Sequence, residues 1–168
     1  KYSEYLSPVA DTYAYALLGN HFHLLLRVRE DSDLSTFKKL TNLSTANAHQ
    51  VTSHQFRKFF QSYAMAFNKQ HGRIGGLFQT PFKRAWINKE EYFQALVFYI
   101  HANPQSHGLI SDFREWQWSS YKGSLSNKPT RLKKDEVIKW FGGSVNFKKY
   151  HEAHYQDLSE KNILLEDD

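Results

Sequence analysis

The stretch that decides the fold is YALLGNHFHLLLRV, residues 15–28. Its apolar run predicts a buried β-strand over residues 12–28. Because side chains alternate across a strand, His21, His23 and Leu25 would share one face. Two imidazoles on neighbouring positions of one face can chelate a single metal ion. The alternative is a polar strand face that happens to hold two histidines.

Composition bounds the function before any motif is considered. The 168 residues predict one domain with a small C-terminal appendage, and 16% aromatic residues suit both a core and stacking on unpaired bases. A net charge of +5 favours a polyanionic partner. The absence of cysteine excludes disulfides, zinc–thiolate sites and thiol chemistry. The apolar runs are too short for a membrane span. The chain opens at Lys1 without a signal-peptide pattern, so we expect a cytoplasmic protein or a fragment of one.

The first half of the chain predicts three helices. A short helix within residues 1–9 ends at Pro8, and another covers residues 33–40, before a polar loop. From Thr52 the spacing becomes helical, and one stripe of this helix carries the aromatic side chains of Phe56, Phe59, Phe60, Tyr63 and Phe67.

The ends of that long helix have their own signals. Thr52 and Gln55 predict a capping box at its start, and Gly72 suits its C-terminal stop. A glycine-rich turn over residues 72–80 then leads to a predicted strand over residues 82–87.

The second half begins with a helix that Asn88 and Glu91 would cap and that ends near Asn103, because Pro104 disfavours helical geometry in the residue before it. Residues 105–128 look irregular. Two further helices are predicted over residues 130–141 and 145–158, separated by a pair of glycines.

Tyr99 and Asn103 stand four residues apart on the predicted helix, so they face the same way, one turn apart. An amide oxygen opposite two histidines can act as a third metal ligand, with the phenol beside it. Metal and phenol would then meet at one phosphate. The alternative is that Tyr99 packs in the core and Asn103 only ends the helix.

Other charged residues are weaker candidates. Four of them, Arg27, Arg73, Lys83 and Arg84, are candidates for DNA phosphate contacts or ordinary solvated charges. His101 and His107 flank the predicted site, where they could contact DNA or a leaving oxygen, but a packing or surface role is the main expectation for both.

Several motifs in a fixed order resemble one family. They are LGNHFHLLL (18–26), YAMAFN (63–68), GGLFQ (75–79), YIHANP (99–104) followed by His107-Gly108, and WSSY (118–121). Together they are similar to the single-tyrosine HUH transposases, in particular the REP-associated tyrosine transposases of the insertion-sequence-200-like superfamily. The resemblance runs over residues 15–125.

The resemblance implies an α+β fold, a ferredoxin-like HUH domain over residues 1–125 with a helical C-terminal extension over residues 126–168. The family pattern begins with a strand and helix that this chain largely lacks. It usually places an arginine near Pro81, where Lys83 and Arg84 would take over the phosphate contacts.

Carried over to this chain, the family's chemistry assigns each site residue a role. His21, His23 and Asn103 would bind Mg²⁺ or Mn²⁺, and Tyr99 would be the nucleophile. The implied activity is cleavage and transfer of single-stranded or hairpin DNA through a 5′-phosphotyrosine, and a homodimer is one assembly it allows.

Two other functions remain open on the residues alone. One is a metal-dependent hydrolase in which a third histidine completes a zinc site. The other is a non-catalytic, domesticated DNA-binding protein.

Overall fold

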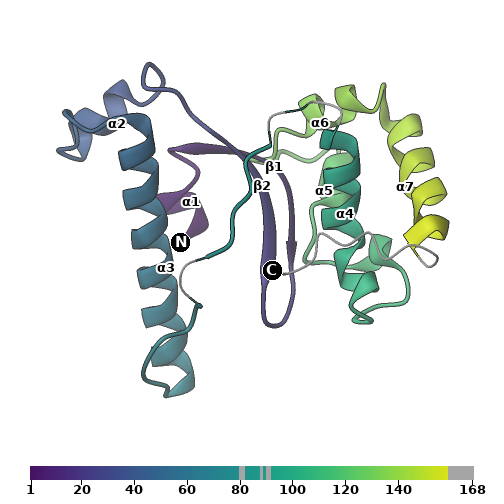
Figure 1. Ribbon diagram of the computed structural model, residues 1–168, viewed down its shortest axis with the longest axis horizontal. Coiled ribbons are helices and arrows are strands. Elements are labelled where there is room, and N and C mark those ends of the chain that lie inside the picture. The colour runs from purple at the N-terminus through teal and green to yellow at the C-terminus, as the bar shows by residue number, and fades with distance from the viewer. Residues whose placement is uncertain (80–81, 88, 90–91, 159–168) are drawn as a thin grey trace. The chain divides into compact units, whose positions relative to one another are not determined.

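The computed structural model describes residues 1–79, 82–87, 89 and 92–158 and has the predicted α+β class (Figure 1). Among these residues the sheet consists of two antiparallel strands, so the further strands of a ferredoxin-like sheet stay a prediction. No helix in the described part is long and apolar enough to cross a membrane. The elements in chain order are α1 (Tyr2–Tyr5), β1 (Ala10–Leu17), β2 (Phe22–Val28), α2 (Ser35–Leu40), α3 (Ala48–His71), α4 (Tyr92–Ser106), the 3₁₀ turn η1 (Phe113–Glu115), α5 (Tyr121–Leu125), α6 (Lys134–Trp140) and α7 (Ser144–Leu158).

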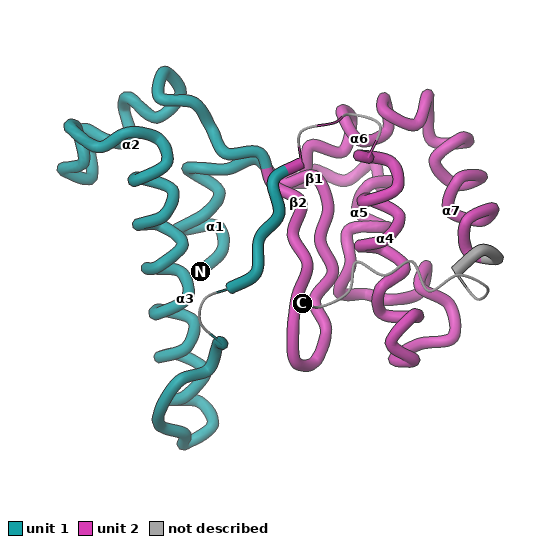
Figure 2. The backbone as a smooth tube through the Cα atoms, in the orientation of Figure 1, with its two compact units in different colours: residues 1–11, 27–86 teal, residues 12–26, 87–168 magenta. Residues whose placement is uncertain are grey.

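The chain consists of two compact units, which Figure 2 shows in different colours. Unit 1 comprises residues 1–11 and 27–86 and holds α1, α2 and α3, whereas unit 2 comprises residues 12–26 and 87–168 and holds the remaining helices. Helices before and after residue 125 contribute to one core in unit 2. The predicted boundary between a catalytic domain and an extension at residue 125 stays a prediction.

The predicted single strand over residues 12–28 is two strands, and that expectation was wrong. The chain turns at Gly19-Asn20, where the Leu18 N–H donates to the His21 carbonyl at 2.9 Å. Glycine and asparagine are turn formers, and the apolar run on each side of them is long enough for its own strand. His21 therefore lies in the turn, and β2 begins at Phe22.

The helix α3 is the longest described helix of unit 1 and begins earlier than predicted. Its capping box is Asn47 with Gln50, which exchange side-chain and backbone hydrogen bonds of 2.9 and 3.0 Å, instead of Thr52 with Gln55. An asparagine oxygen is as good an N-cap as a threonine hydroxyl, so the same chemistry acts five residues upstream. The C-terminal stop at Gly72, with φ of 60°, is confirmed.

The aromatic stripe of α3 packs against the segment that follows it. Phe60 lies 4.9 Å from Phe78 and 5.2 Å from Phe82, measured between ring centroids. Phe82 also stacks on Phe56. Residues 82–87 form no strand, contrary to the prediction. The segment is held to α3 by the ring packing of Phe82 and not by backbone hydrogen bonds to a neighbouring strand.

The helix α4 continues past the predicted end at Asn103 and includes Pro104. Proline has no backbone N–H to donate, and the burial of apolar side chains such as Val97 and Ile100 offsets the loss of that hydrogen bond. The helix ends at Ser106, and Gly108, two residues further on, has a φ of 68° that suits a left-handed cap. The predicted caps Asn88 and Glu91 lie outside the described residues.

The C-terminal helices belong to the same core as α4. Val137 of α6 and Phe147 of α7 are fully buried in the cluster that also contains Leu25 and Val97. The helix predicted over residues 130–141 begins at Lys134, and the glycine pair at 142–143 separates it from α7 as expected. The interval expected to be irregular, residues 105–128, contains the end of α4, η1 and α5.

Candidate active site

Two histidines at the tip of the β1–β2 hairpin form one side of the candidate site in unit 2. The His21 and His23 ring centroids lie 5.1 Å apart, with the rings nearly perpendicular. The side-chain oxygen of Asn20 lies 2.7 Å from Nδ1 of His21 and holds that ring. The turn therefore positions His21, and the strand positions His23.

Strand alternation brings His23 onto α4. Leu25, two residues after His23, is buried in the same cluster as Ile100 and so orients this face of β2 toward α4. The His23 ring lies 5.5 Å from the Tyr99 ring at an angle of 79°. The predicted meeting of the histidine strand and the tyrosine helix is present in the structure.

Asn103 lies one helical turn after Tyr99 and is only 2% exposed. Its side-chain oxygen Oδ1 is buried and accepts no hydrogen bond. Leaving a buried polar atom without a partner costs roughly 1–3 kcal/mol, so such an atom in a folded protein needs an explanation. A cation held at this oxygen would supply one.

The donor set fits a divalent cation. Imidazole nitrogens and an amide oxygen are both used as ligands for first-row divalent metals, with the oxygen favouring Mn²⁺ or Mg²⁺. Nε2 of His23 is shielded from solvent, as Asn103 Oδ1 is. His21, His23 and Asn103 are therefore the residues that would hold such an ion.

His107 is a neighbour of the site, although a packing or surface role was its main expectation from the sequence. Its ring lies 5.0 Å from that of His21, and it is exposed. The sequence feature that points to His107 is its spacing, because it follows Asn103 by one further turn of helix. The backbone N–H of His107 donates to the Asn103 carbonyl at 3.0 Å. No group of three histidine or acidic side chains in the described residues is arranged to hold a metal ion, so His107 does not complete a three-histidine site.

A buried chain of hydrogen bonds fixes the opposite side of α4. Nδ1 of His151 donates to the Phe147 carbonyl at 2.8 Å, because a carbonyl can only accept. The His151 Nε2 can then accept from Nδ1 of His101 at 3.0 Å, and the Ser120 hydroxyl lies 2.7 Å from the remaining His101 nitrogen. The Tyr15 N–H donates to that hydroxyl, which links α7, α4 and β1.

The two histidines in this chain of hydrogen bonds, His101 and His151, are neutral at pH 7. Burial lowers the pKa of His151 to about 4, because desolvation disfavours the charged ring. Burial, with the neighbouring His151, also holds the pKa of His101 well below its ordinary value. The expectation of a packing role for His101 agrees with its complete burial.

The four predicted phosphate contacts all lie in unit 1. The Arg27 guanidinium is 3.3 Å from a carboxylate oxygen of Asp11. The guanidiniums of Arg73 and Arg84 lie over the rings of Phe67 and Phe82, at 5.7 and 6.0 Å. Lys83 is exposed. Unit 2 thus brings the rings of His21, His23 and Tyr99 together, with Asn103 one turn further along α4, while the four basic residues belong to the other unit.

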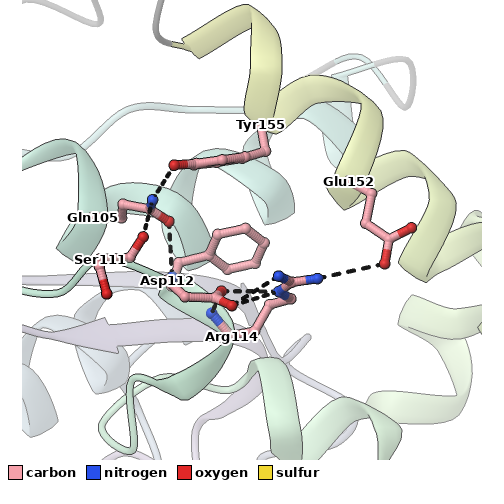
Figure 3. A pocket seen from close by; sticks show the side chains of 7 residues that line it. Gln105, Ser111, Asp112, Arg114, Glu152 and Tyr155 are labelled. Carbon is pink, nitrogen blue, oxygen red and sulfur yellow. Dashed lines mark hydrogen bonds and ion pairs between the residues drawn. The ribbon is translucent and has the colours of Figure 1, made fainter.

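A separate hollow of about 260 Å³ in unit 2 lies among α4, η1 and α7 (Figure 3). The Gln105 amide donates to the Ser111 carbonyl and the Tyr155 hydroxyl. The Arg114 guanidinium pairs with Asp112 at 2.8 Å and holds the pKa of that carboxyl below its usual value. These polar groups bond to one another, and the hydrogen bond from Gln105 to Tyr155 fastens α7 to α4.

Comparison with known proteins supports the resemblance. The chain is 27% identical over 113 residues to a curated protein of Haemophilus influenzae named "Putative REP-associated tyrosine transposase". The match covers 66% of this chain and 58% of that protein, so it spans little more than half of the relative. No family model matches the chain, and no solved structure matches it.

Proposed function

We propose that this chain cleaves and rejoins a DNA strand, with Tyr99 as the nucleophile. The observation that carries the proposal is the contact of the His23 and Tyr99 rings, one turn from the buried, unsatisfied oxygen of Asn103. The similarity to a protein named as a tyrosine transposase agrees with this chemistry. That similarity also supports DNA as the partner, and its single-stranded or hairpin form is part of the proposal.

Tyr99 would attack the phosphorus of a DNA backbone phosphate. The phenol oxygen forms a bond to phosphorus as the bond to the 3′ oxygen breaks, which leaves a 5′-phosphotyrosine and a free 3′-hydroxyl. The phenol gives up one proton and the departing oxygen takes one up. The covalent step conserves the phosphodiester bond energy, so a later 3′-hydroxyl can reverse it and join the strand.

The chain's own residues would orient these groups. His21, His23 and Asn103 would hold a divalent ion, Mg²⁺ or Mn²⁺, which when bound withdraws charge from the phosphate and lowers the barrier by several kcal/mol. The buried hydrogen bonds of His101 would keep α4 in place, so that Tyr99 and Asn103 can face the hairpin tip together. The unpartnered Asn103 oxygen supports this assignment.

The decisive experiment compares Tyr99→Phe with Tyr92→Phe, which removes the hydroxyl of a half-exposed tyrosine on the same helix. Each protein is mixed with labelled hairpin DNA that carries single-stranded flanks and with Mn²⁺, and then run on a denaturing gel. We expect a covalent band for the parent and Tyr92→Phe, and none for Tyr99→Phe.

A hydrolase would behave differently in the same experiment. It would cut the DNA without a covalent band and keep its turnover in Tyr99→Phe. A covalent band in Tyr99→Phe would rule out the assigned nucleophile, and binding without any cleavage by the parent would favour a DNA-binding protein.

A further inference from the structure

The basic residues of the chain are distributed unevenly. Residues 34–89 contain nine lysines and arginines and no aspartate or glutamate. The remaining residues contain 13 basic and 17 acidic side chains. The positive charge that favours a polyanionic partner therefore comes from one continuous stretch, most of which is α3 and its flanks.

A groove of about 490 Å³ runs between α1 and α3 in unit 1. It contains two lysines of α3, Lys58 and Lys69, which are exposed and form no ion pair within the part of the chain that the structure describes. At 3.6 residues per turn these lysines and Met65 lie on the side of α3 opposite the aromatic stripe. The groove face is thus the solvent side of the helix.

We propose that this groove binds the backbone of single-stranded DNA, with Lys58 and Lys69 contacting phosphates and Met65 and Tyr5 contacting a base. The two lysines are eleven residues apart, or about 16 Å along the helix, which spans more than one nucleotide. Met65 is 73% exposed between them, and an apolar side chain in that position suits an unstacked base. The choice of DNA rests on the proposed function.

Two features favour a nucleic acid over an acidic peptide. The groove presents the sides of helices, whose backbone groups are already hydrogen-bonded, so it offers no edge for an extended peptide to pair with. Gln61 and Ser62 also line it, and their uncharged donors suit phosphate oxygens as the lysines do. An acidic peptide is therefore an outcome that the test must distinguish.

The test measures binding of labelled oligothymidylate, twenty nucleotides long, by fluorescence anisotropy at several salt concentrations. The variant is Lys58→Gln with Lys69→Gln, and the matched control is Lys148→Gln with Lys149→Gln, two exposed lysines of α7. We expect the groove variant to flatten the slope of log affinity against log salt by about 1.4, or 0.7 for each lost phosphate. The control should keep the parent slope.

Further variants separate the contributions. Lys58→Arg with Lys69→Arg keeps both charges and should restore the slope, while Met65→Ala should weaken binding with no change in slope. Because all of these positions are on the surface, each variant should have the parent circular-dichroism spectrum.

The outcomes decide the groove and the nuclease separately. An unchanged salt slope in the groove variant contradicts the proposal that the groove binds DNA, even if the parent forms the covalent band of Tyr99. A flattened slope supports the groove, even if the parent never cleaves DNA and the nuclease proposal fails. Failure of the parent to bind the oligonucleotide, or displacement of the oligonucleotide from the parent by polyglutamate as readily as by unlabelled oligothymidylate, overturns the assignment to DNA.

Discussion

Unit 1 and unit 2 contain equal numbers of lysines and arginines, eleven each, but five acidic residues in unit 1 face twelve in unit 2. Unit 1 is therefore strongly basic and unit 2 nearly neutral. The residues proposed for chemistry all lie in unit 2, and those proposed for phosphate contacts all lie in unit 1. The residues proposed to attract a polyanion and those proposed to react with it thus belong to separate parts of the chain.

The two units also differ in what their buried parts contain. The core of unit 2 surrounds two neutral histidines and the buried Asn103. In unit 1 the buried polar side chains among the described residues are Thr52 and Gln55, which do not titrate. Acid and metal should therefore act on unit 2, and salt on unit 1.

The largest expected effect is on catalysis by unit 2. His23→Ala removes one of the three proposed metal ligands, so Mn²⁺-dependent formation of the covalent band should fall by about a thousandfold, which corresponds to several kcal/mol. Affinity for oligothymidylate should stay near the parent value because the proposed phosphate contacts lie in unit 1. Calorimetric titration with Mn²⁺ checks the cause, and undiminished Mn²⁺ binding would make the histidine pair structural.

Acid should destabilise unit 2 selectively. Because the pKa of His151 is lower in the folded state, the unfolded chain binds more protons between pH 6.5 and about 4. The contribution of neutral His151 to the free energy of unfolding is fully present above pH 6.5. It falls as the pH drops, and about 3 kcal/mol is lost near pH 4. Urea unfolding of Trp86→Phe, whose other tryptophans lie in unit 2, measures this loss.

The matched variant for the acid experiment is His101→Gln with His151→Gln. It cannot titrate at these positions, so its stability should be lower at pH 7 and should change less between pH 7 and pH 4. An unaltered pH dependence would place the acid sensitivity elsewhere.

Salt dependence should change through unit 1. Lys83→Ala with Arg84→Ala should weaken binding to a cognate and a scrambled DNA hairpin by the same factor, and should flatten the salt slope by about 1.4. Preference between the two hairpins should survive because shape and unpaired bases carry it. Filter binding at several salt concentrations provides the measurement. Lost preference with the parent slope would mean that these residues contact bases.

The smallest effect concerns the end of α3. Gly72→Ala forces a side chain into a left-handed conformation with φ of 60° and should cost about 1 kcal/mol. Gly76→Ala is the control, because its φ is not positive and the added carbon meets nothing within 4 Å. Urea denaturation compares the two variants, and an equal loss in both would show that the cap does not limit stability.

Local patterns in the sequence predicted much of the site. The i, i+4 spacing of Tyr99 and Asn103 survives in any helix, and the aromatic stripe of α3 is packed as its period requires. Turn-forming residues explain where the predicted bounds differ, since Gly19-Asn20 splits the predicted strand and α4 runs through Pro104 to Ser106, just before the left-handed Gly108. These errors concern boundaries, where several local signals compete.

By itself the sequence determined which residues are chemically able to act: two histidines beside a turn, and a tyrosine and an asparagine on one helix face. Only the tertiary structure decided that the His23 ring contacts Tyr99, that Asn103 is buried with its oxygen unsatisfied, and that His107 stands beside His21. It also decided that His101 and His151 are partners fifty residues apart. Such contacts depend on how separate elements pack, and no local spacing encodes that packing.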